Sequence, residues 1–362
     1  MVSIAFFGSS LLSAYWNGAA TYYRGIIRAL HDHGHETTFY EPDAYDRQAH
    51  RDLDADAVDW ARVVVYPGDE AGVTWALEQA QGADLAVKAS GVGVFDAFLE
   101  AAILDVPRSG GMAAFWDVDA PATLERVREN PDDPFRALIP RYDLVLTYGG
   151  GDPVVAGYTG LGARACVPVY NALDPSTHHP VPPQTKFEGM LGFLGNRLPD
   201  REARVDAFFL KPAAAMPEGR FLLGGSGWET RRLPDNVDHL GYVGTAEHNA
   251  FNCTPRAVLN VNRESMARNG FSPATRVFEA AGAEACLITD DWEGIELFLE
   301  PGEEVLVAGD GQEVLEHLRR LTRERSAAIG RAARQRLLAE HTYAHRAAQL
   351  VEVLGLGRAD HD

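Results

Sequence analysis

Short apolar runs alternate with amphipathic stretches along the first forty residues. Residues 3–7 form an apolar run, and residues 8–10, Gly-Ser-Ser, follow as a turn. An amphipathic stretch begins after Gly18 and continues to about His33, and residues 37–40 form the next strand-like run. A strand, a helix and a second strand in this order predict a right-handed crossover within a parallel sheet.

The same alternation continues through most of the chain. The pattern predicts further strands at 62–66, 84–88, 112–116, 143–147, 164–169, 190–194, 219–224, 238–243, 256–261, 285–289 and 303–308. Helices are predicted near 72–82, 93–104, 120–129, 153–160, 200–210, 245–252, 273–283, 312–324, 327–340 and 342–354. Alternating strands and helices of this kind indicate α/β architecture with doubly wound parallel sheets.

A proline-rich segment interrupts the alternation and separates two α/β series. The run NALDPSTHHPVPPQTK at 171–186 has no hydrophobic periodicity, which is typical of a linker. With 362 residues, the chain is also longer than one hydrophobic core usually organises. We predict Rossmann-like domains at 1–170 and 188–340, a linker at 171–187 and a C-terminal helical segment at 341–362. Ligands bind beyond the carboxyl ends of such strands, so an active site is expected in a cleft between the domains.

Composition narrows the possible partners. The chain has 33 basic and 52 acidic residues, a net charge of −19, which argues against broad binding to nucleic acid or an anionic membrane. A local basic pocket remains compatible with this charge. No apolar run approaches the roughly 20 residues of a membrane helix. Cys166, Cys253 and Cys286 lie far apart without a CxxC spacing, which indicates reduced thiols, and there is no leader-like N-terminus. We therefore expect a cytoplasmic protein without an integral membrane segment.

The most informative block for chemistry is residues 260–296. A strand ends in polar residues, and a loop then opens a helix with Thr275, Arg276 and Glu279 in its first two turns. Free amides at a helix N-terminus attract phosphate, and Arg276 would add positive charge. The Glu279 carboxylate could accept two hydrogen bonds from a ribose diol. The alternative is an ordinary amphipathic helix, with Arg276 and Glu279 as a surface pair.

Three segments carry a resemblance to a known family. The run SPATRVFEAAGAEACLITDDWEGIELFLEPGEEVLVAGD, which starts at Ser272, resembles the C-terminal signature of group-1-type glycosyltransferases of the GT-B fold. It is most similar to their CgeB-like (spore-maturation) branch, as are FWDVDAP at 115–121 and VYNALDPSTHHPV at 169–181. The resemblance spans nearly the whole chain. It implies two Rossmann-like domains, a nucleotide-sugar donor, no obligatory metal, and a last helix that crosses back onto the N-terminal domain.

The resemblance also implies roles in donor binding. In related enzymes the loop that matches residues 194–201 gives a basic pair to the donor diphosphate, which would be Arg197 and Arg201. The strand end at 241–244 would hold the nucleobase through backbone groups of Tyr242 and Val243, although Tyr242 could instead belong to the core. The full set of predicted donor-binding residues is Arg197, Arg201, Tyr242, Val243, Arg263, Ser272, Thr275, Arg276 and Glu279.

One departure from the family pattern bears on stereochemistry. Retaining members of the superfamily carry two glutamates eight residues apart, of which Glu279 matches the second, whereas Phe271 stands at the first. We therefore expect inversion, which requires a base beside the acceptor hydroxyl. Asp117 and Asp119 are the catalytic candidates, because they follow a predicted strand. The alternative for Asp117 is that it only orders the turn before the next helix, and a metal is not expected there.

Further candidates line the edge of the N-terminal domain. They are Gly8, Ser9 and Ser10 after the first strand, with Lys88 and Ser90 at the end of a later one. The expected function is transfer of a sugar from a UDP-, GDP- or dTDP-linked donor to an unknown acceptor, without a further cofactor. The alternatives are a nucleotide-sugar epimerase or hydrolase of the same fold, and a non-catalytic nucleotide-sugar-binding protein.

Overall fold

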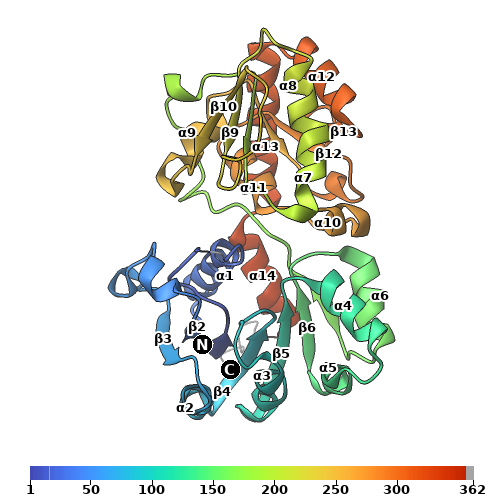
Figure 1. Ribbon diagram of the computed structural model, residues 1–362. Helices are drawn as coiled ribbons and strands as arrows, with labels where there is room; N and C mark the ends of the chain where they lie inside the picture. Colours follow the sequence, from blue (N-terminus) through green and yellow to red (C-terminus); the bar gives the residue numbers. More distant parts are fainter. Residues whose placement is uncertain (16, 356–362) are drawn as a thin grey trace. The chain divides into compact units, whose positions relative to one another are not determined.

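The computed structural model describes residues 1–15 and 17–355 and divides the chain into two compact units (Figure 1). Unit 1 consists of Met1–Asn171 and Tyr343–Asp362, and unit 2 of Ala172–Thr342. Each unit is built on one parallel sheet, which confirms the predicted class of two Rossmann-like domains. Residues 356–362 of the predicted C-terminal segment 341–362 lie outside the described residues.

Unit 1 contains a seven-stranded sheet whose order reverses between β1 and β4. The strands in spatial order are β3 (Arg62–Pro67), β2 (Glu36–Asp43), β1 (Ser3–Phe7), β4 (Ala83–Ala89), β5 (Pro107–Asp117), β6 (Leu144–Thr147) and β7 (Cys166–Pro168). All pairings are parallel. Chain segments that leave β1 and β4 diverge to opposite sides, which opens space for a ligand at this point of the edge.

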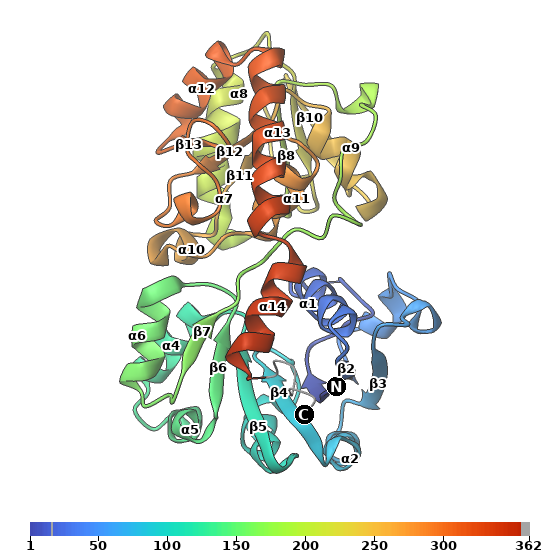
Figure 2. The same cartoon turned by 180° about the vertical axis from the view of Figure 1, so that it is seen from behind.

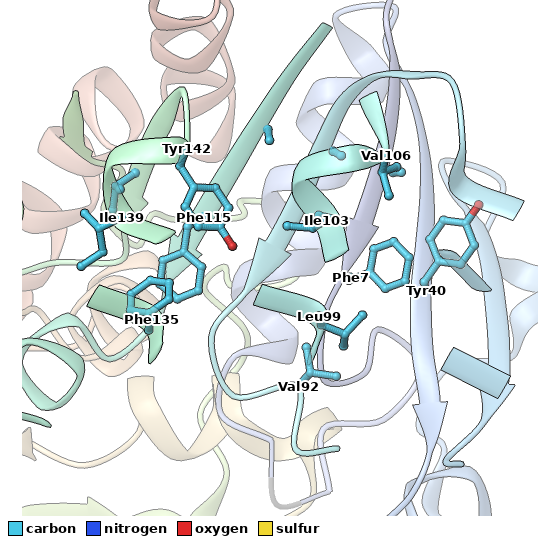
Figure 3. Packing of buried hydrophobic residues seen from close by; sticks show 14 of the residues in the cluster. Phe7, Tyr40, Val92, Leu99, Ile103, Val106, Phe115, Phe135, Ile139 and Tyr142 are labelled. Atoms are coloured by element: carbon cyan, nitrogen blue, oxygen red, sulfur yellow. The ribbon is translucent and has the colours of Figure 1, made fainter. Parts of the chain in front are cut away.

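Helices cover both faces of this sheet (Figures 1 and 2). Side chains alternate along a strand, so Phe6 stacks on Phe39 with ring centroids 5.2 Å apart, whereas Phe7 stacks on Tyr40 at 4.6 Å on the opposite face. Figure 3 shows Phe7 and Tyr40 in the core on that opposite face. The face with Phe6 is covered by α1 (Ala20–Asp32) and α14 (Tyr343–Val353), and the other by α2 (Glu70–Ala80), α3 (Asp96–Ala102), α4 (Ala120–Glu129), α5 (Pro134–Leu138) and α6 (Gly151–Gly160).

The helix that returns to unit 1, α14, packs closely on α1. A Cβ at Gly25 of α1 would lie 2.2 Å from the ring of Tyr343, so only glycine permits this approach. Arg346 donates to the carbonyl oxygens of Tyr170 (3.2 Å) and Asn171 (3.4 Å), just beyond β7. These bonds fix α14 to the segment through which the chain leaves unit 1.

Unit 2 repeats the arrangement with six parallel strands. Their order is β10 (Val237–Gly241), β9 (Phe221–Gly224), β8 (Leu191–Leu194), β11 (Ala257–Asn260), β12 (Leu287–Asp290) and β13 (Leu306–Ala308). One face packs against α7 (Pro199–Val205), a π-helical turn (Asp206–Leu210), α8 (Lys211–Ala214) and α12 (Gly311–Arg320). The other carries α9 (His248–Cys253), α11 (Thr275–Gly282) and α13 (Arg323–Glu340), as Figure 2 shows. The order reverses between β8 and β11.

Two segments of unit 2 differ from the sequence-based expectation. The predicted linker, 171–187, lies along unit 2, where Thr177 accepts a bond from Asn249 Nδ2 (2.9 Å) and Gln184 donates its amide to Thr254 Oγ1 (3.1 Å). The polar stretch after β11, predicted to be a loop, contains a short helix, α10 (Glu264–Asn269).

Candidate functional site

A pocket of about 200 Å³ lies in unit 2, where the carboxyl ends of β8, β9 and β10 meet the first turns of α11. Part of its lining comes from the end of β8 and the turn after it, Leu194, Gly195 and Asn196, and from Gly225 after β9. The remaining wall comes from the residues after β10, from α9 and from α11. The pocket therefore lies next to the reversal of strand order, where α/β domains bind their ligands.

Arg276 supplies positive charge to the pocket wall. It lies in the first turn of α11, and its Cζ is 5.7 Å from the centroid of the Phe193 ring. Burial lowers the pKa of Arg276 to about 10; Glu279 opposes this shift and Arg201 adds to it. The guanidinium remains protonated near neutral pH. A charged group with part of its hydration removed is a strong partner for an anion.

Arg201 lies close to Arg276 on the same aromatic ring. Its Cζ is also 5.7 Å from the Phe193 centroid, and its Nη2 donates to the carbonyl oxygen of Asn196 at 2.8 Å. That bond ties Arg201 to a residue of the pocket lining. The two arginines concentrate positive charge beside the pocket in a chain of net charge −19.

Glu279 lines the pocket one turn after Arg276 on α11, so both predicted residues face the same space. Its carboxylate is the acidic group of the lining, alongside His248 and Asn252 from α9. Burial lowers the pKa of His248, which Glu279 opposes and Arg276 reinforces. The His248 Nε2–H group donates to the carbonyl oxygen of Val243 at 3.2 Å. The pocket thus offers a cation at one position and hydroxyl acceptors at another.

Tyr242 and Val243 both line the pocket after β10, but their side chains differ. Tyr242 is 78% exposed, so its alternative assignment to the core is wrong. The side chain of Val243 is buried, and its carbonyl oxygen is already bonded to His248. Tyr242 therefore offers an open aromatic face at the rim.

Arg197 is not one of the residues that line the pocket. Its Nη2 bonds to Glu202 Oε1 at 2.8 Å, and its Nη1 donates to Thr230 Oγ1 at 3.3 Å. The guanidinium is thus held between α7 and the segment after β9. Arg201, rather than Arg197, is the arginine of this loop that lies beside Arg276.

The other predicted donor residues lie on the segment that leads to α11. Arg263 precedes α10, Ser272 is buried and Thr275 starts α11; these three are outside the pocket lining. Phe271 has a left-handed backbone (φ 47°), and its amide donates to the carbonyl oxygen of Glu293 at 2.6 Å. The aromatic residue at the position of the family's first glutamate is therefore part of a fixed turn.

The buried carboxylate of Asp290 holds the segment between β11 and α11 through hydrogen bonds. Asp290 ends β12, is fully buried and accepts bonds from the amide of Asn262 (3.2 Å) and from Arg204 Nη2 (2.7 Å). Burial raises the pKa of Asp290, and Arg204 opposes the rise. Arg204 also reaches Glu264 of α10 at 3.2 Å. The network connects α7, α10 and β12 and so fixes the approach to α11.

In unit 1, Asp117 is enclosed at the end of β5. It is fully buried; its Oδ2 accepts from the hydroxyl of Tyr158, and its Oδ1 accepts the amide of Asp119 at 3.0 Å. These bonds order the turn before α4. The expectation that Asp117 is the base is not supported by these surroundings, because its carboxylate is shielded from an acceptor hydroxyl. Asp119, which precedes α4, is exposed.

The predicted site residues in the loop after β1 are also buried and hydrogen-bonded within unit 1. Ser9 Oγ donates to Asn17 Oδ1 at 2.9 Å, and Ser10 Oγ donates to Glu41 Oε1 at 3.0 Å. Both serines are buried, and so is Gly8. These residues stabilise the loop and do not form an exposed binding surface.

Lys88 and Ser90, at the end of β4, are likewise held by contacts within unit 1. Lys88 is fully buried, and its ammonium group is paired with Asp96 of α3. Ser90 Oγ accepts the amide of Val118 at 2.9 Å. The two side chains connect β4 to the neighbouring loops of unit 1.

Six residues of the pocket lining were not among the predicted site residues: Leu194, Gly195, Asn196, Gly225, His248 and Asn252. Asn196 stood beside the predicted Arg197, so the glycine turn after β8 did point to its position. His248 and Asn252 carry no local signal, because only the packing of α9 against α11 brings them to the pocket. Within residues 1–15 and 17–355, no cluster of three or more His, Cys, Asp or Glu residues could hold a metal ion. No helix of this described part is long and apolar enough to span a bilayer.

Comparison with known proteins links this geometry to a class of enzymes. Residues 201–352, which include the Arg276 and Glu279 pair, match the model of a family described as glycosyl transferase-like. No curated protein matches the sequence.

Solved structures resemble the chain over nearly its full length. HepE of Anabaena, solved with UDP and glucose, is 14% identical with a TM-score of 0.68, over 98% of this chain and 100% of that chain. Sucrose-phosphate synthase of Thermosynechococcus elongatus is 12% identical with a TM-score of 0.71, over 98% and 99%. AviGT4, a glycosyltransferase involved in avilamycin A biosynthesis, is 17% identical with a TM-score of 0.62, over 99% of both chains. The two parallel-sheet domains of this chain have the GT-B fold that these structures share.

Proposed function

We propose that this protein is a glycosyltransferase that takes its sugar from a nucleoside-diphosphate donor bound in the unit 2 pocket. The observation that carries the proposal is that Arg276 and Glu279, one turn apart on α11, both line that pocket. The match of residues 201–352 to a glycosyl transferase-like family and the UDP in the HepE structure support it.

Each pocket group has a role in this proposal. Arg276, with Arg201 beside it, binds the diphosphate and neutralises the charge that develops on it when the bond to the anomeric carbon breaks. Glu279 accepts hydrogen bonds from the two ribose hydroxyls. The open ring of Tyr242 stacks against the nucleobase. UDP and GDP offer all three features, whereas dTDP offers the diphosphate, the base and only the 3′-hydroxyl of its sugar.

The acceptor hydroxyl attacks the anomeric carbon while the bond to the diphosphate oxygen breaks. The proton of that hydroxyl needs an acceptor, and we propose the exposed Asp119 for this role, with inversion of configuration. Asp117 would then act by ordering the turn on which Asp119 lies.

The finer assignments belong to the same proposal. We propose membership of the CgeB-like branch, from the similarity of residues 115–121 and 169–181. We also propose catalysis without a metal or other cofactor, and a cytoplasmic location, which agrees with three free cysteines. Activity that persists in EDTA would support metal independence.

The test is a donor screen that measures release of the nucleoside diphosphate. The purified protein is incubated with UDP-, GDP- and dTDP-linked sugars, with and without a panel of saccharide acceptors. Release together with a new glycosidic product only when an acceptor is present supports the proposal. Release or epimerisation without an acceptor would favour the hydrolase or epimerase alternative, and binding without turnover would favour a non-catalytic protein.

A further inference from the structure

An exposed aromatic residue, Tyr45, lies at the carboxyl edge of the unit 1 sheet, two residues after the end of β2. It is 60% exposed, whereas the predicted residues Ser9, Ser10 and Lys88 at the same edge are buried. A large aromatic side chain that is open to solvent at this edge is the kind of surface that contacts ligands.

The ring of Tyr45 is held in place on two sides. Its hydroxyl donates to the carbonyl oxygen of Gly93, in the loop after β4, at 2.7 Å. Gly93 has φ 104°, and a Cβ there would lie 2.7 Å from the ring, so the close approach requires glycine. The guanidinium of Arg47 lies over the ring, with Cζ 5.1 Å from the centroid, and Arg47 in turn donates to the carbonyl oxygen of Ser9 at 3.1 Å.

Through these contacts Tyr45 is connected to the loops that follow β1 and β4, the two strands between which the strand order reverses. Tyr45 follows β2, and its hydroxyl is bonded to Gly93 in the loop after β4. Arg47, which lies over the ring, is bonded to Ser9 in the loop after β1. Since β1 and β4 are the neighbours at the reversal, Tyr45 lies at the position where a doubly wound domain binds its ligand.

The backbone at this site is strained. Tyr45 and Asp46 are consecutive non-glycine residues in the left-handed region, with φ of 57° and 55°. Phe95, two residues after Gly93, is a third, with φ 53°, and it is also exposed. Bulky residues rarely adopt this conformation, and where they do the strain is commonly found at binding sites.

We propose that Tyr45 is the platform on which a pyranose ring of a saccharide acceptor stacks; this inference rests on the proposed function. The open face of the ring would contact the C–H face of the sugar. The exposed carboxylates of Asp43 and Asp46, in the same turn, would accept hydrogen bonds from its hydroxyls.

Two other ligand classes fit the site less well. A cation would be attracted by the carboxylates and by an aromatic face, but the Arg47 guanidinium already occupies one face of this ring and would repel it. A flat apolar ligand needs apolar walls, whereas two carboxylates flank Tyr45 in the turn 43–46.

The test uses saturation-transfer difference NMR on the full-length protein with maltose, cellobiose, lactose and N,N′-diacetylchitobiose. At least one disaccharide should receive saturation at its ring C–H protons. The signal should fall about fivefold or more in Tyr45→Ala, as the loss of one stacking contact predicts. Trp75→Ala, which removes another exposed aromatic residue on α2, is the matched control and should leave it unchanged.

A second variant separates binding from folding. Tyr45→Gly relieves the left-handed strain, so it should fold and still lose the signal. Absence of a signal from all four disaccharides with the wild type, or a signal in both Tyr45 variants as strong as in the wild type, would overturn the inference. So would a Tyr45-dependent signal from 4-nitrophenol or tetramethylammonium and none from the sugars.

Calorimetry with UDP, GDP and dTDP distinguishes this inference from the proposed function. Nucleotide affinity should be the same in wild type and in the Tyr45 variants, because the unit 2 pocket contains none of the changed atoms. If no nucleotide binds the wild type, the proposed function fails, whereas the disaccharide signal and its dependence on Tyr45 still decide the saccharide site.

Discussion

The guanidinium groups of Arg201 and Arg276 lie over the same ring, that of Phe193, each with Cζ 5.7 Å from its centroid. Two like charges beside one buried phenyl ring repel each other, and Arg201 contributes to the lowered pKa of Arg276. A bound diphosphate would relieve this repulsion, because it brings negative charge to both groups. The pair is therefore poised for an anionic ligand.

The first prediction concerns Arg276. Arg276→Ala should weaken the binding of UDP, GDP or dTDP, whichever binds best, by about 1.5–3 kcal/mol, the usual value of a hydrogen bond to a charged group. Binding of the bare nucleoside should change little, since the lost attraction is to phosphate. Isothermal calorimetry with both ligands measures the difference, and equal losses for both would contradict the role.

Arg197→Ala is the matched control for this arginine. Because Arg197 bonds to Glu202 and Thr230 outside the pocket lining, its removal should leave nucleotide affinity within about threefold of wild type, a change of about 0.7 kcal/mol. A loss as large as that of Arg276→Ala would restore Arg197 as a diphosphate ligand.

The second prediction concerns Glu279. Glu279→Gln keeps the shape of the side chain but removes the charge, so nucleotide binding should weaken by about 1.5–3 kcal/mol. The 2′-deoxynucleotide should lose less affinity than the ribonucleotide, because one of the two hydroxyl partners is already missing. Calorimetry of both ligands in both proteins forms a double-mutant cycle. If the loss of affinity caused by Glu279→Gln is the same for the ribonucleotide and the 2′-deoxynucleotide, Glu279 does not bind the 2′-hydroxyl of the ribose.

The third prediction separates the two aspartates of unit 1. Asp119→Asn should lower turnover by at least about 100-fold while nucleotide affinity stays intact, because the variant lacks the proton acceptor. Near-normal turnover would exclude Asp119 as the base.

Asp117→Asn is expected to act mainly on stability. The buried carboxylate accepts from Tyr158 and from the amide of Asp119, so its replacement should lower the free energy of unfolding by about 1–3 kcal/mol. A shift of the urea midpoint with unchanged slope measures this loss. A variant of wild-type stability that lost turnover selectively would instead return Asp117 to the chemistry.

The fourth prediction concerns the thiols. Burial raises the pKa of Cys166 and of Cys286 to about 12, and burial also raises the pKa of Cys253. The thiolate is the reactive form, so raised pKa values mean less thiolate at pH 8 and slow reaction. Native protein should react with Ellman's reagent far more slowly than protein in urea, where all three thiols become accessible. Rapid reaction of Cys166 or Cys286 in the native protein would contradict the buried position of that thiol.

The fold could be predicted from sequence because its signals are local. Strand β3 was expected at 62–66 and runs Arg62–Pro67, since an apolar run bounded by turns specifies it. Strand β5 begins five residues before its predicted start at 112, because residues 107–111, Pro-Arg-Ser-Gly-Gly, lack an apolar run. Pro107 nevertheless pairs with Ala83 of β4, and the register shifts before Met112 pairs with Leu85. Helix α10 was missed because residues 264–269 have no apolar periodicity.

The candidate site was predictable only in part. Arg276 and Glu279 follow a recognisable strand–loop–helix pattern, and both line the pocket. His248 reaches it because α9 packs on α11, which no local pattern encodes. Asp117 is an example of the opposite kind, a predicted catalytic residue whose surroundings do not favour that role. An aspartate after a strand is a plausible base by residue type, but its hydrogen bonds with Tyr158 and Asp119 become visible only in the structure.

The return of the chain to unit 1 has a consequence for biosynthesis. Unit 2 is continuous in sequence, whereas unit 1 requires α14, which leaves the ribosome only after all of unit 2 has been made. Until then the surface of α1 around Gly25, which the ring of Tyr343 covers in the finished protein, remains exposed to water. The nascent N-terminal half therefore carries an uncovered aromatic face during synthesis, and it is the segment on which chaperones would have the longest opportunity to act.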